Sequence, residues 1–529
     1  MRPLRFFLPA LLFGTASAKI NWSPCNKTES NPIFTRFQCA TLDVPFDYTN
    51  PNSTEKLSLQ LIKIPAPLGS KGSILANPGG PGQPGRTGIA QLASPLIPLT
   101  GGEYDIISFD TRGTENTIPF ECTQDVIDQF AMYKAIVPGN SSEGAVGMLW
   151  ARGTIDGKQC AANASRIGSV LTTAFVARDM MQIVDALEED GLLRYWGLSY
   201  GTTLGATVAA MFPDRMDKII LDGVQNPHEY YHSTANIEEW SDADAAFSDL
   251  FVHCVKAGPK HCPLAAHNKT AAVLEEITWG LLDRVKTHPI PVGPMLLDYS
   301  GLKGYVQQTM YGMRNWPALM KLLDNILFNG NYDDMESILQ TTAQTLSTDP
   351  VMREATRRAV ISLAGIYCGD NQVRTNSLRD FLPTITALYN TSRLSGDGAI
   401  GSYMGCQQWM IKPKEVFRGP FQAKTKTPIL IIGNTLDSHT PLKSAHNVSA
   451  GYEGSVVLEV NGNGHASNSV PSICLFEKTT AFWKNGTLPD EGTVCERDVE
   501  PFTDVWWPEV LKEGGVDEAL LIYDSDASI

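Results

Sequence analysis

Short apolar runs separated by helical patterns make up the first half of the chain. Polar and apolar residues alternate over residues 56–61, as in a strand with one face in solvent. Buried strands are indicated by mostly apolar runs that end at turn-forming residues. These runs cover residues 73–76, 105–109, 193–198 and 218–221. Residues 172–187 and the segment after Gly201 have the apolar spacing of helices, so the pattern predicts an α/β fold with a mostly parallel sheet.

Long amphipathic helices without convincing strands replace this alternation between about residues 225 and 421. They are predicted over residues 243–256, 305–328 and 351–366. Strand patterns return at 428–433 and 456–460, and a closing helix is predicted over 470–483. The pattern therefore predicts one sheet interrupted by a large helical lid. The expected divisions are a first part of the core (19–224), the lid (225–421), a second part of the core (422–500) and an acidic, weakly patterned tail (501–529).

The first 18 residues have the features of a secretory signal peptide. Arg2 and Arg5 precede an apolar run that ends in Thr15-Ala16-Ser17-Ala18, and cleavage is expected after Ala18. The run is shorter than the roughly 20 residues of a spanning helix, so no membrane anchor is expected in the mature chain. The sequence predicts a secreted, extracellular protein.

Cysteines and glycosylation sequons agree with export. An oxidising compartment lets the ten cysteines form disulfides, and short separations favour pairing neighbours along the chain, although the sequence alone leaves other pairings open. The favoured pairs are Cys25 with Cys39, Cys122 with Cys160, Cys254 with Cys262, Cys368 with Cys406, and Cys474 with Cys495. Candidate N-glycosylation sites are Asn21, Asn26, Asn52, Asn140, Asn163, Asn268, Asn390, Asn447 and Asn485.

Composition narrows the class of partner. The chain has 529 residues and a net charge of −15, and it has no cluster of Lys and Arg that would bind phosphates, so a nucleic-acid partner is not expected. The cysteines do not form a zinc-binding pattern, and no motif suggests a metal or an organic cofactor. The expected partner is a peptide or a small-molecule acyl substrate; the oligomeric state cannot be read from the sequence.

Gly197-Leu198-Ser199-Tyr200-Gly201 is a Gly-x-Ser-x-Gly motif between a predicted strand and a predicted helix. In α/β-hydrolases such a sharp turn exposes the serine at the edge of the sheet, and glycines on both sides make room for it. A serine hydroxyl is a poor nucleophile and needs an adjacent base that is oriented by a carboxylate. The motif therefore predicts Ser199 as a nucleophile.

The acid and the base should follow the serine in that order, on loops after late strands. Asp437 and His465 fit this order and are predicted as the orienting acid and the general base. His439 is a rival base, but it lies almost beside Asp437 on the same loop. Asp222, which ends an earlier strand, is the rival acid.

Two further motifs follow early strands. Asn77-Pro78-Gly79-Gly80-Pro81-Gly82 corresponds to the loop that contributes to an oxyanion hole in α/β-hydrolases, with the residue after the nucleophile as the other contributor. The main-chain N–H groups of Gly79, Gly80 and Tyr200 are the candidate donors. For Asp110-Thr111-Arg112-Gly113 a structural role is expected, in which the charged groups brace neighbouring loops.

These motifs together resemble the tripeptidyl aminopeptidase-like branch of the α/β-hydrolases, which are relatives of the prolyl aminopeptidases. The similarity extends to Leu221-Asp222-Gly223-Val224, Asp437-Ser438-His439-Thr440-Pro441 and the segment 254–262. It implies removal of residues or short peptides from a free N terminus, with a carboxylate of the lid binding the substrate amine. Candidates for that carboxylate are Glu229, Glu238 and Glu239. Prolyl aminopeptidases usually have His where this chain has Asn77.

Three functions are compatible with these residues. A secreted serine exopeptidase is favoured. An esterase or lactonase would use the same nucleophile, base and oxyanion hole on a small molecule. A hydrolase-fold protein that only binds its ligand is the third, and it is disfavoured because each predicted triad member is present in the sequence.

Overall fold

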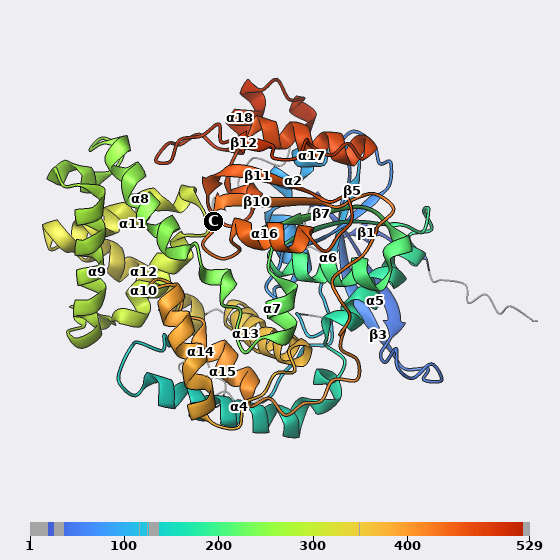
Figure 1. The fold of residues 1–529 in the computed structure, drawn as a ribbon, viewed down its shortest axis with the longest axis horizontal. Helices are drawn as coiled ribbons and strands as arrows, with labels where there is room; N and C mark the ends of the chain where they lie inside the picture. Colours follow the sequence, from blue (N-terminus) through green and yellow to red (C-terminus); the bar gives the residue numbers. More distant parts are fainter. Residues whose placement is uncertain are drawn as a thin grey trace, which may run out of the picture.

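A ten-stranded sheet is the centre of the molecule (Figure 1). The computed structural model describes residues 19–25, 36–115, 117–123, 125, 128, 137–348 and 350–521, and within 342–359 only the backbone. The strands, in their order across the sheet, are β1 (Ser23–Pro24), β2 (Gln38–Pro45), β3 (Lys56–Ile64), β5 (Asp105–Phe109), β4 (Ser73–Asn77), β6 (Leu193–Leu198), β7 (Met216–Asp222), β10 (Leu430–Leu436), β11 (Val456–Asn463) and β12 (Val494–Glu496).

The sheet changes from antiparallel to parallel at β5. Strands β1, β2, β3 and β5 pair antiparallel in that order, whereas every neighbouring pair from β5 to β12 is parallel. Parallel neighbours have their carboxyl ends at the same edge, so the loops after β4, β6, β7, β10 and β11 all open on one side of the molecule. The predicted mostly parallel α/β sheet is confirmed.

Helices cover both faces of the sheet. Successive residues of β4 point to opposite faces, so Ile74 and Ala76 belong to one buried cluster and Leu75 to the other. The first cluster includes residues of α1 (Gly85–Gln91), α2 (Ala93–Leu99), α17 (Ile473–Asn485) and α18 (Trp507–Glu513). The second includes residues of α5 (Thr173–Ala186), α6 (Tyr200–Met211) and α16 (Leu442–Ser449).

The chain leaves the sheet after β7 and returns to it at β10, its direct neighbour. The segment between them, here called the helical insertion, lies beside the sheet (Figure 1). Its longer elements are α7 (Pro227–His232), α8 (Ala243–Ala257), α9 (Ala271–Thr287), α10 (Tyr299–Thr309), α11 (Trp316–Asp324), α12 (Asp333–Thr348), α13 (Pro350–Asp370), α14 (Leu378–Thr391) and α15 (Ile400–Gln407). A small hairpin of β8 (Ile290–Val292) and β9 (Met295–Leu297) was not expected from the sequence.

One helix from outside the insertion packs against it. Helix α4 (Ala145–Gly168) lies along α15 in Figure 1. A Cβ atom at Gly157 would lie 2.4 Å from the carbonyl oxygen of Gln408, so a glycine is needed at this contact. The domain limits predicted from the sequence stay predictions, and α4 joins the helical layer from the part of the chain before β6.

Two predicted elements differ from the structure. The helix expected over 305–328 is broken between α10 and α11, and Tyr311 lies in the break. The tail after residue 500 contains α18, whose Trp507 is buried against the sheet. Apolar spacing continues through Met310, Met313 and Trp316, which explains why the periodicity did not reveal the break.

Features expected of an exported chain can be compared with the described residues. The five predicted cysteine pairs are the five disulfides of the structure. All the sequon asparagines except Asn26 lie among the described residues, and each of these is exposed. The predicted signal peptide and Asn26 lie outside the described residues. Within the described part of the chain, no helix is both long enough and apolar enough to cross a lipid bilayer.

Candidate active site

Ser199 stands at the turn between β6 and α6, in a backbone conformation that few residues other than glycine adopt. Its φ and ψ are 56° and −128°. Its main-chain N–H donates to the carbonyl oxygen of Asp222 at 3.1 Å, which fixes the turn to the end of β7. The glycines on either side are required by space: a Cβ at Gly197 would lie 2.2 Å from the carbonyl oxygen of Gly201, and one at Gly201 2.6 Å from that of Asn77.

Asp437 lies directly after β10, and its buried carboxylate accepts several hydrogen bonds. The donors are the main-chain N–H groups of His439, Thr440 and Ala466, each at 2.9 Å, and the hydroxyl of Thr440 at 2.7 Å. Burial alone would raise the pKa of Asp437, but the nearby His465 and these donors lower it to about 2. The group is therefore ionised at neutral pH.

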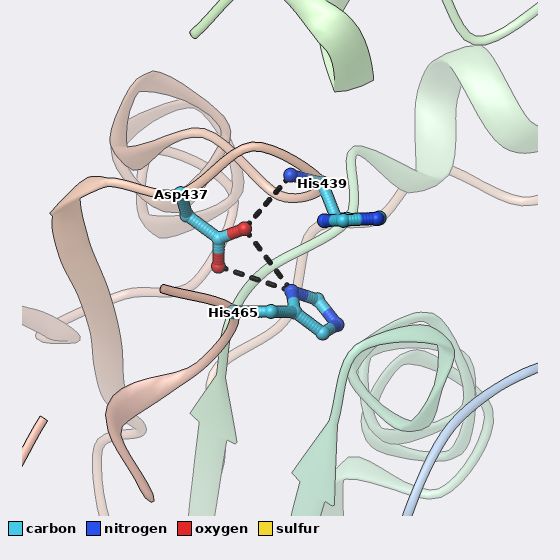
Figure 2. A group of neighbouring side chains, drawn as sticks. All are labelled: Asp437, His439 and His465. Carbon is cyan, nitrogen blue, oxygen red and sulfur yellow. Dashed lines mark hydrogen bonds and ion pairs between the residues drawn. The ribbon is translucent and has the colours of Figure 1, made fainter. Parts of the chain in front are cut away.

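His465 follows β11 and faces Asp437. Its Nδ1 lies 3.1 Å from both carboxylate oxygens of Asp437 (Figure 2). Burial would lower the pKa of His465, but Asp437 opposes this and raises it above its usual value. This arrangement leaves Nε2 as the nitrogen that does not face Asp437, so it is available for proton transfer.

The loop that carries His465 is held from three directions. Asn434 donates to the carbonyl oxygens of Gly464 and Ala466 at 2.8 and 2.7 Å. Asp222 accepts from the main-chain N–H and the hydroxyl of Ser467 at 2.8 and 2.7 Å. The main-chain N–H of His465 donates to the carbonyl oxygen of Tyr311 at 2.9 Å, so the helical insertion contacts this loop directly.

The two rivals considered from the sequence have other contacts. The ring of His439 contacts the hydroxyl of Ser438 through Nδ1 at 2.8 Å, and only its main-chain N–H reaches Asp437 (Figure 2). Burial and the neighbouring His465 lower the pKa of His439 to about 3, so its ring is neutral. Asp222 contacts Ser467 and the indole N–H of Trp196, and burial raises its pKa to about 6. Asp437 is thus the carboxylate that contacts the ring of His465.

Asp437, His439 and His465 also form a group that could hold a metal ion, since one ligand atom from each lies within 4.8 Å of the others. Nδ1 of His465 is hydrogen bonded to Asp437. These contacts fit a histidine that is oriented by a carboxylate.

A cavity of about 390 Å³ joins the sheet edge to the helical insertion. Ser199 and His465 both line it, although they come from different strands, and Gly80 lines it from the loop after β4. Aromatic side chains form much of the remaining wall: Tyr230, Trp240, Tyr311, Tyr367, His439 and Tyr403. The size is in the usual range for small-molecule and peptide sites.

The three candidate oxyanion donors differ in availability. The N–H of Gly79 already donates to Oδ1 of Asn77 at 3.0 Å. A Cβ at Gly79 would lie 2.7 Å from Cβ of Ser199, so this glycine makes room for the serine. Gly80 lines the cavity, and Tyr200 begins α6, where main-chain N–H groups lack partners within the helix. Gly80 and Tyr200 are therefore better placed than Gly79 to receive a negative oxygen.

The three candidate amine-binding carboxylates are also separated by the structure. Glu239 is the one carboxylate among the described residues that line the cavity, where it accepts from the side chains of Asn236 and Gln225 at 2.7 and 3.3 Å. Burial raises the pKa of Glu239 to about 7. Glu229 accepts the main-chain N–H of Glu238, whose own carboxylate binds Ser444 and Asn447 of α16.

The chain matches two family models. One is described as the alpha/beta hydrolase fold and covers residues 73–256, and the other is described as TAP-like protein and covers residues 392–495. The chain belongs to the α/β-hydrolase superfamily. Within this superfamily the TAP-like match includes both Asp437 and His465, and the other match includes Ser199.

Relatives of this α/β-hydrolase act on more than one kind of bond, according to their names. Serine protease Hip1 of Mycobacterium tuberculosis is 26% identical over 90% of this chain and 91% of its own. Tripeptidyl aminopeptidase of Streptomyces lividans is 24% identical, with coverages of 92% and 88%. Carboxylesterase B of M. tuberculosis is 24% identical, with coverages of 90% and 89%. The chain is a serine hydrolase of a family that includes peptidases.

The sequence did not indicate two groups of contacts at the site. Tyr311 meets the loop of His465, and Thr440 contacts both Asp437 and Nδ1 of His465, the latter at 3.0 Å. The Asp437-Ser438-His439-Thr440 string could have indicated the contact of Thr440, because a hydroxyl three residues after an aspartate can donate a hydrogen bond to its carboxylate. Nothing in the sequence around Tyr311 marks its long-range contact.

Proposed function

We propose that this α/β-hydrolase is a secreted serine exopeptidase that releases residues or short peptides from free N termini. The observation that carries the proposal is Glu239, a partly buried carboxylate that lines the same cavity as Ser199 and His465. A carboxylate at that position gives a cationic amine a partner within reach of the nucleophile. The names of the relatives Hip1 and tripeptidyl aminopeptidase support a peptide substrate.

The proposed chemistry begins with attack on the carbonyl carbon of the scissile bond. Oγ of Ser199 forms the new bond while Nε2 of His465 takes the hydroxyl proton, and Asp437 stabilises the imidazolium. The N–H groups of Gly80 and Tyr200 donate to the oxyanion. When the tetrahedral intermediate collapses, His465 returns the proton to the leaving amine, and the N-terminal part of the substrate stays esterified to Ser199.

Water completes the cycle by the same steps in reverse. His465 takes a proton from the attacking water, the second tetrahedral intermediate collapses, and the proton returns to Oγ of Ser199. The released acid carries the free amine that Glu239 binds. Because Glu239 holds the amine and Ser199 meets the carbonyl, the length of chain between these two groups would set the size of the released fragment.

The test is a peptide library offered with free and with acetylated N termini, with products identified by mass. Cleavage of the free peptides alone is expected, since acetylation removes the charge that Glu239 binds. Glu239→Gln should raise KM for free peptides at least about tenfold, in keeping with a lost charge-assisted contact. The matched control is Glu229→Gln, whose carboxylate holds the main-chain N–H of Glu238. Equal cleavage of free and acetylated peptides would contradict the aminopeptidase activity.

An esterase is the second candidate, because carboxylesterase B is among the relatives. It would use the same Ser199, His465 and Asp437. Comparison of acyl esters with peptidyl anilides separates the two: an esterase hydrolyses only the esters, whereas the exopeptidase hydrolyses anilides with a free amine. Ser199→Ala should abolish both activities.

Secretion is supported by the five disulfides and by the exposed sequon asparagines. Expression in a eukaryotic secretory host should yield a chain that begins at Lys19, as read by N-terminal sequencing. Removal of N-glycans should lower its apparent mass. A product that stays inside the cell with Met1 still present would contradict this part of the proposal.

A further inference from the structure

Asp370 is a buried carboxylate that takes no part in the proposed proton transfers. It is the last residue of α13, and it is 1% exposed. It accepts hydrogen bonds from the main-chain N–H of Thr173 at 2.8 Å, from the hydroxyl of Thr173 at 2.5 Å and from the hydroxyl of Tyr230 at 3.1 Å. Its partners therefore lie on α5 and α7, so this one carboxylate joins the helical insertion to a helix that packs on the sheet.

The chain of hydrogen bonds continues to the residue after the nucleophile. The hydroxyl of Thr173 gives its proton to the carboxylate, so it accepts from the hydroxyl of Tyr200, which lies 2.6 Å away. The sequence of donors is thus Tyr200 to Thr173 to Asp370. The side chain of Tyr200 is therefore held by a residue of the insertion. The main-chain N–H of the same residue is a proposed oxyanion donor.

The end of α13 is itself well anchored. Cys368, two residues before Asp370, is bonded to Cys406 of α15. Asn371, the next residue, donates to the carbonyl oxygens of Tyr230 and Ser233, both at 2.8 Å. Asp370 and Asn371 therefore hold the side chain and the main chain of Tyr230, which is part of the cavity wall.

We propose that Asp370 is a positioning residue, which holds Tyr200 and Tyr230 so that the oxyanion-binding N–H and one wall of the cavity have the geometry that acylation of Ser199 needs. This inference rests on the proposed function only for the acylation of Ser199 and not for the choice of peptide or ester. Displacing a donor by a fraction of an ångström weakens its bond to the transition state more than its contact with the ground state.

The test uses Asp370→Asn, Tyr200→Phe and the double variant of the full chain. Asparagine has the size of aspartate but accepts with only one of its two polar atoms. Asp370→Asn should lower kcat about 10- to 100-fold, less than the loss typical for deleting a whole oxyanion donor, with a KM change under about threefold. Tyr200→Phe should also lower kcat. The double variant should be no slower than the slower single variant, because both substitutions break the same chain of hydrogen bonds.

Tyr48→Phe is the matched control. The hydroxyl of Tyr48 donates to buried Asp179 at 2.7 Å, so its loss removes a tyrosine–carboxylate bond away from the cavity. This variant should melt at a lower temperature with kcat unchanged. A similar fall in kcat for Tyr48→Phe would overturn the proposal, since general destabilisation would then explain all three results.

Each activity measurement is made with a free peptide and with a neutral acyl ester, and labelling of Ser199 by a fluorophosphonate is timed. The ester and the label report acylation even where no peptide is cleaved, so failure of the exopeptidase proposal is seen separately. A folded Asp370→Asn protein with wild-type kcat and labelling rate would overturn the inference. Where Asp370→Asn does not fold, wild-type kcat in Tyr200→Phe would overturn it instead.

Discussion

Nδ1 of His465 lies 3.1 Å from each carboxylate oxygen of Asp437. Asp222, the other candidate for the orienting acid, instead accepts a hydrogen bond from Ser467, two residues after His465. Asp437→Asn keeps the size of the group but removes the charge that orients and stabilises the imidazolium. It should lower kcat on the order of 10⁴-fold with little change in KM. Steady-state kinetics on a peptidyl anilide measure this. A larger loss in Asp222→Asn than in Asp437→Asn would contradict the assignment of the acid.

The pH dependence of kcat/KM should differ between charged and neutral substrates. His465 must be neutral to take a proton, and its raised pKa puts the loss of activity, as pH falls, above the usual value of 6.5. Glu239 loses its charge as pH falls through about 7, which weakens amine binding over the same range. A substrate amine loses its proton above about pH 8, so a free peptide should give a bell-shaped profile.

A neutral ester lacks the amine, so its profile should have only the acid limb. In Glu239→Gln the acid limb of the ester profile should move to lower pH, because the charge of Glu239 contributes to the raised pKa of His465, whereas kcat/KM for the peptide should fall. A bell-shaped profile for the neutral ester would contradict the role of the substrate amine in the alkaline limb.

Gly79 provides room for the nucleophile. Its φ is +110°, and a Cβ there would lie 2.7 Å from Cβ of Ser199. Gly79→Ala should therefore displace Ser199 and lower kcat by at least about 100-fold. Gly147→Ala is the matched control, because that glycine of α4 has no atom within 4 Å of an added Cβ. Fluorophosphonate labelling that proceeds at the wild-type rate in Gly79→Ala would be inconsistent with this close contact.

Arg112 and Asp179 form a buried ion pair that braces the loop after β5. The guanidinium donates to Asp179 at 2.6 and 2.8 Å and to the carbonyl oxygens of Pro45 and Phe46, each at 2.6 Å. The predicted structural role is thus confirmed. Arg112→Lys retains the charge but loses the planar fork, so it should lower the free energy of unfolding on the order of 3 kcal/mol. Chemical denaturation measures this, and a folded variant should keep its kcat.

Buried carboxyls should make the protein less stable in mild alkali. Burial raises the pKa of Asp222 to about 6 and those of Glu239 and Asp370 to about 7. A folded-state pKa above the unfolded value gives a contribution that is full below the unfolded value and is lost as pH rises through the folded one. Tm should therefore fall by several degrees between about pH 5 and about pH 8. A constant or rising Tm over this range would contradict these directions.

The position of the candidate site residues at one edge of the sheet could be predicted from the sequence because each motif is short. Ser199, Asp437 and His465 each follow a strand, and parallel strands bring their carboxyl ends to one edge, so three distant motifs could be assigned to one site. The need for glycines on both sides of Ser199 could be predicted from steric reasoning alone. The core strands of the sheet were predicted with ends differing by a few residues.

Contacts that depend on packing between distant segments could not be predicted. Tyr311 reaches His465 only because the helix pattern of 305–328 breaks, and apolar residues continue through the break. Glu239 could not be separated from Glu229 and Glu238, since all three are acidic residues at the start of the insertion and only the fold decides which one lines the cavity. Asp370 carried no local signal, because its partners Thr173 and Tyr230 are far away in the sequence.

Every disulfide closes a stretch of 38 residues or fewer, and none links residues 227–407 to the rest of the chain. Each bridge can therefore form as soon as its own part of the chain has been synthesised, before the two halves of the sheet meet across the long segment between β7 and β10. The attachment of that segment to the sheet then depends on contacts without covalent bonds, such as the one between Tyr311 and His465. Substrate-binding elements and the nucleophile would thus mature in separate steps, and activity would arise only when the last of these contacts forms.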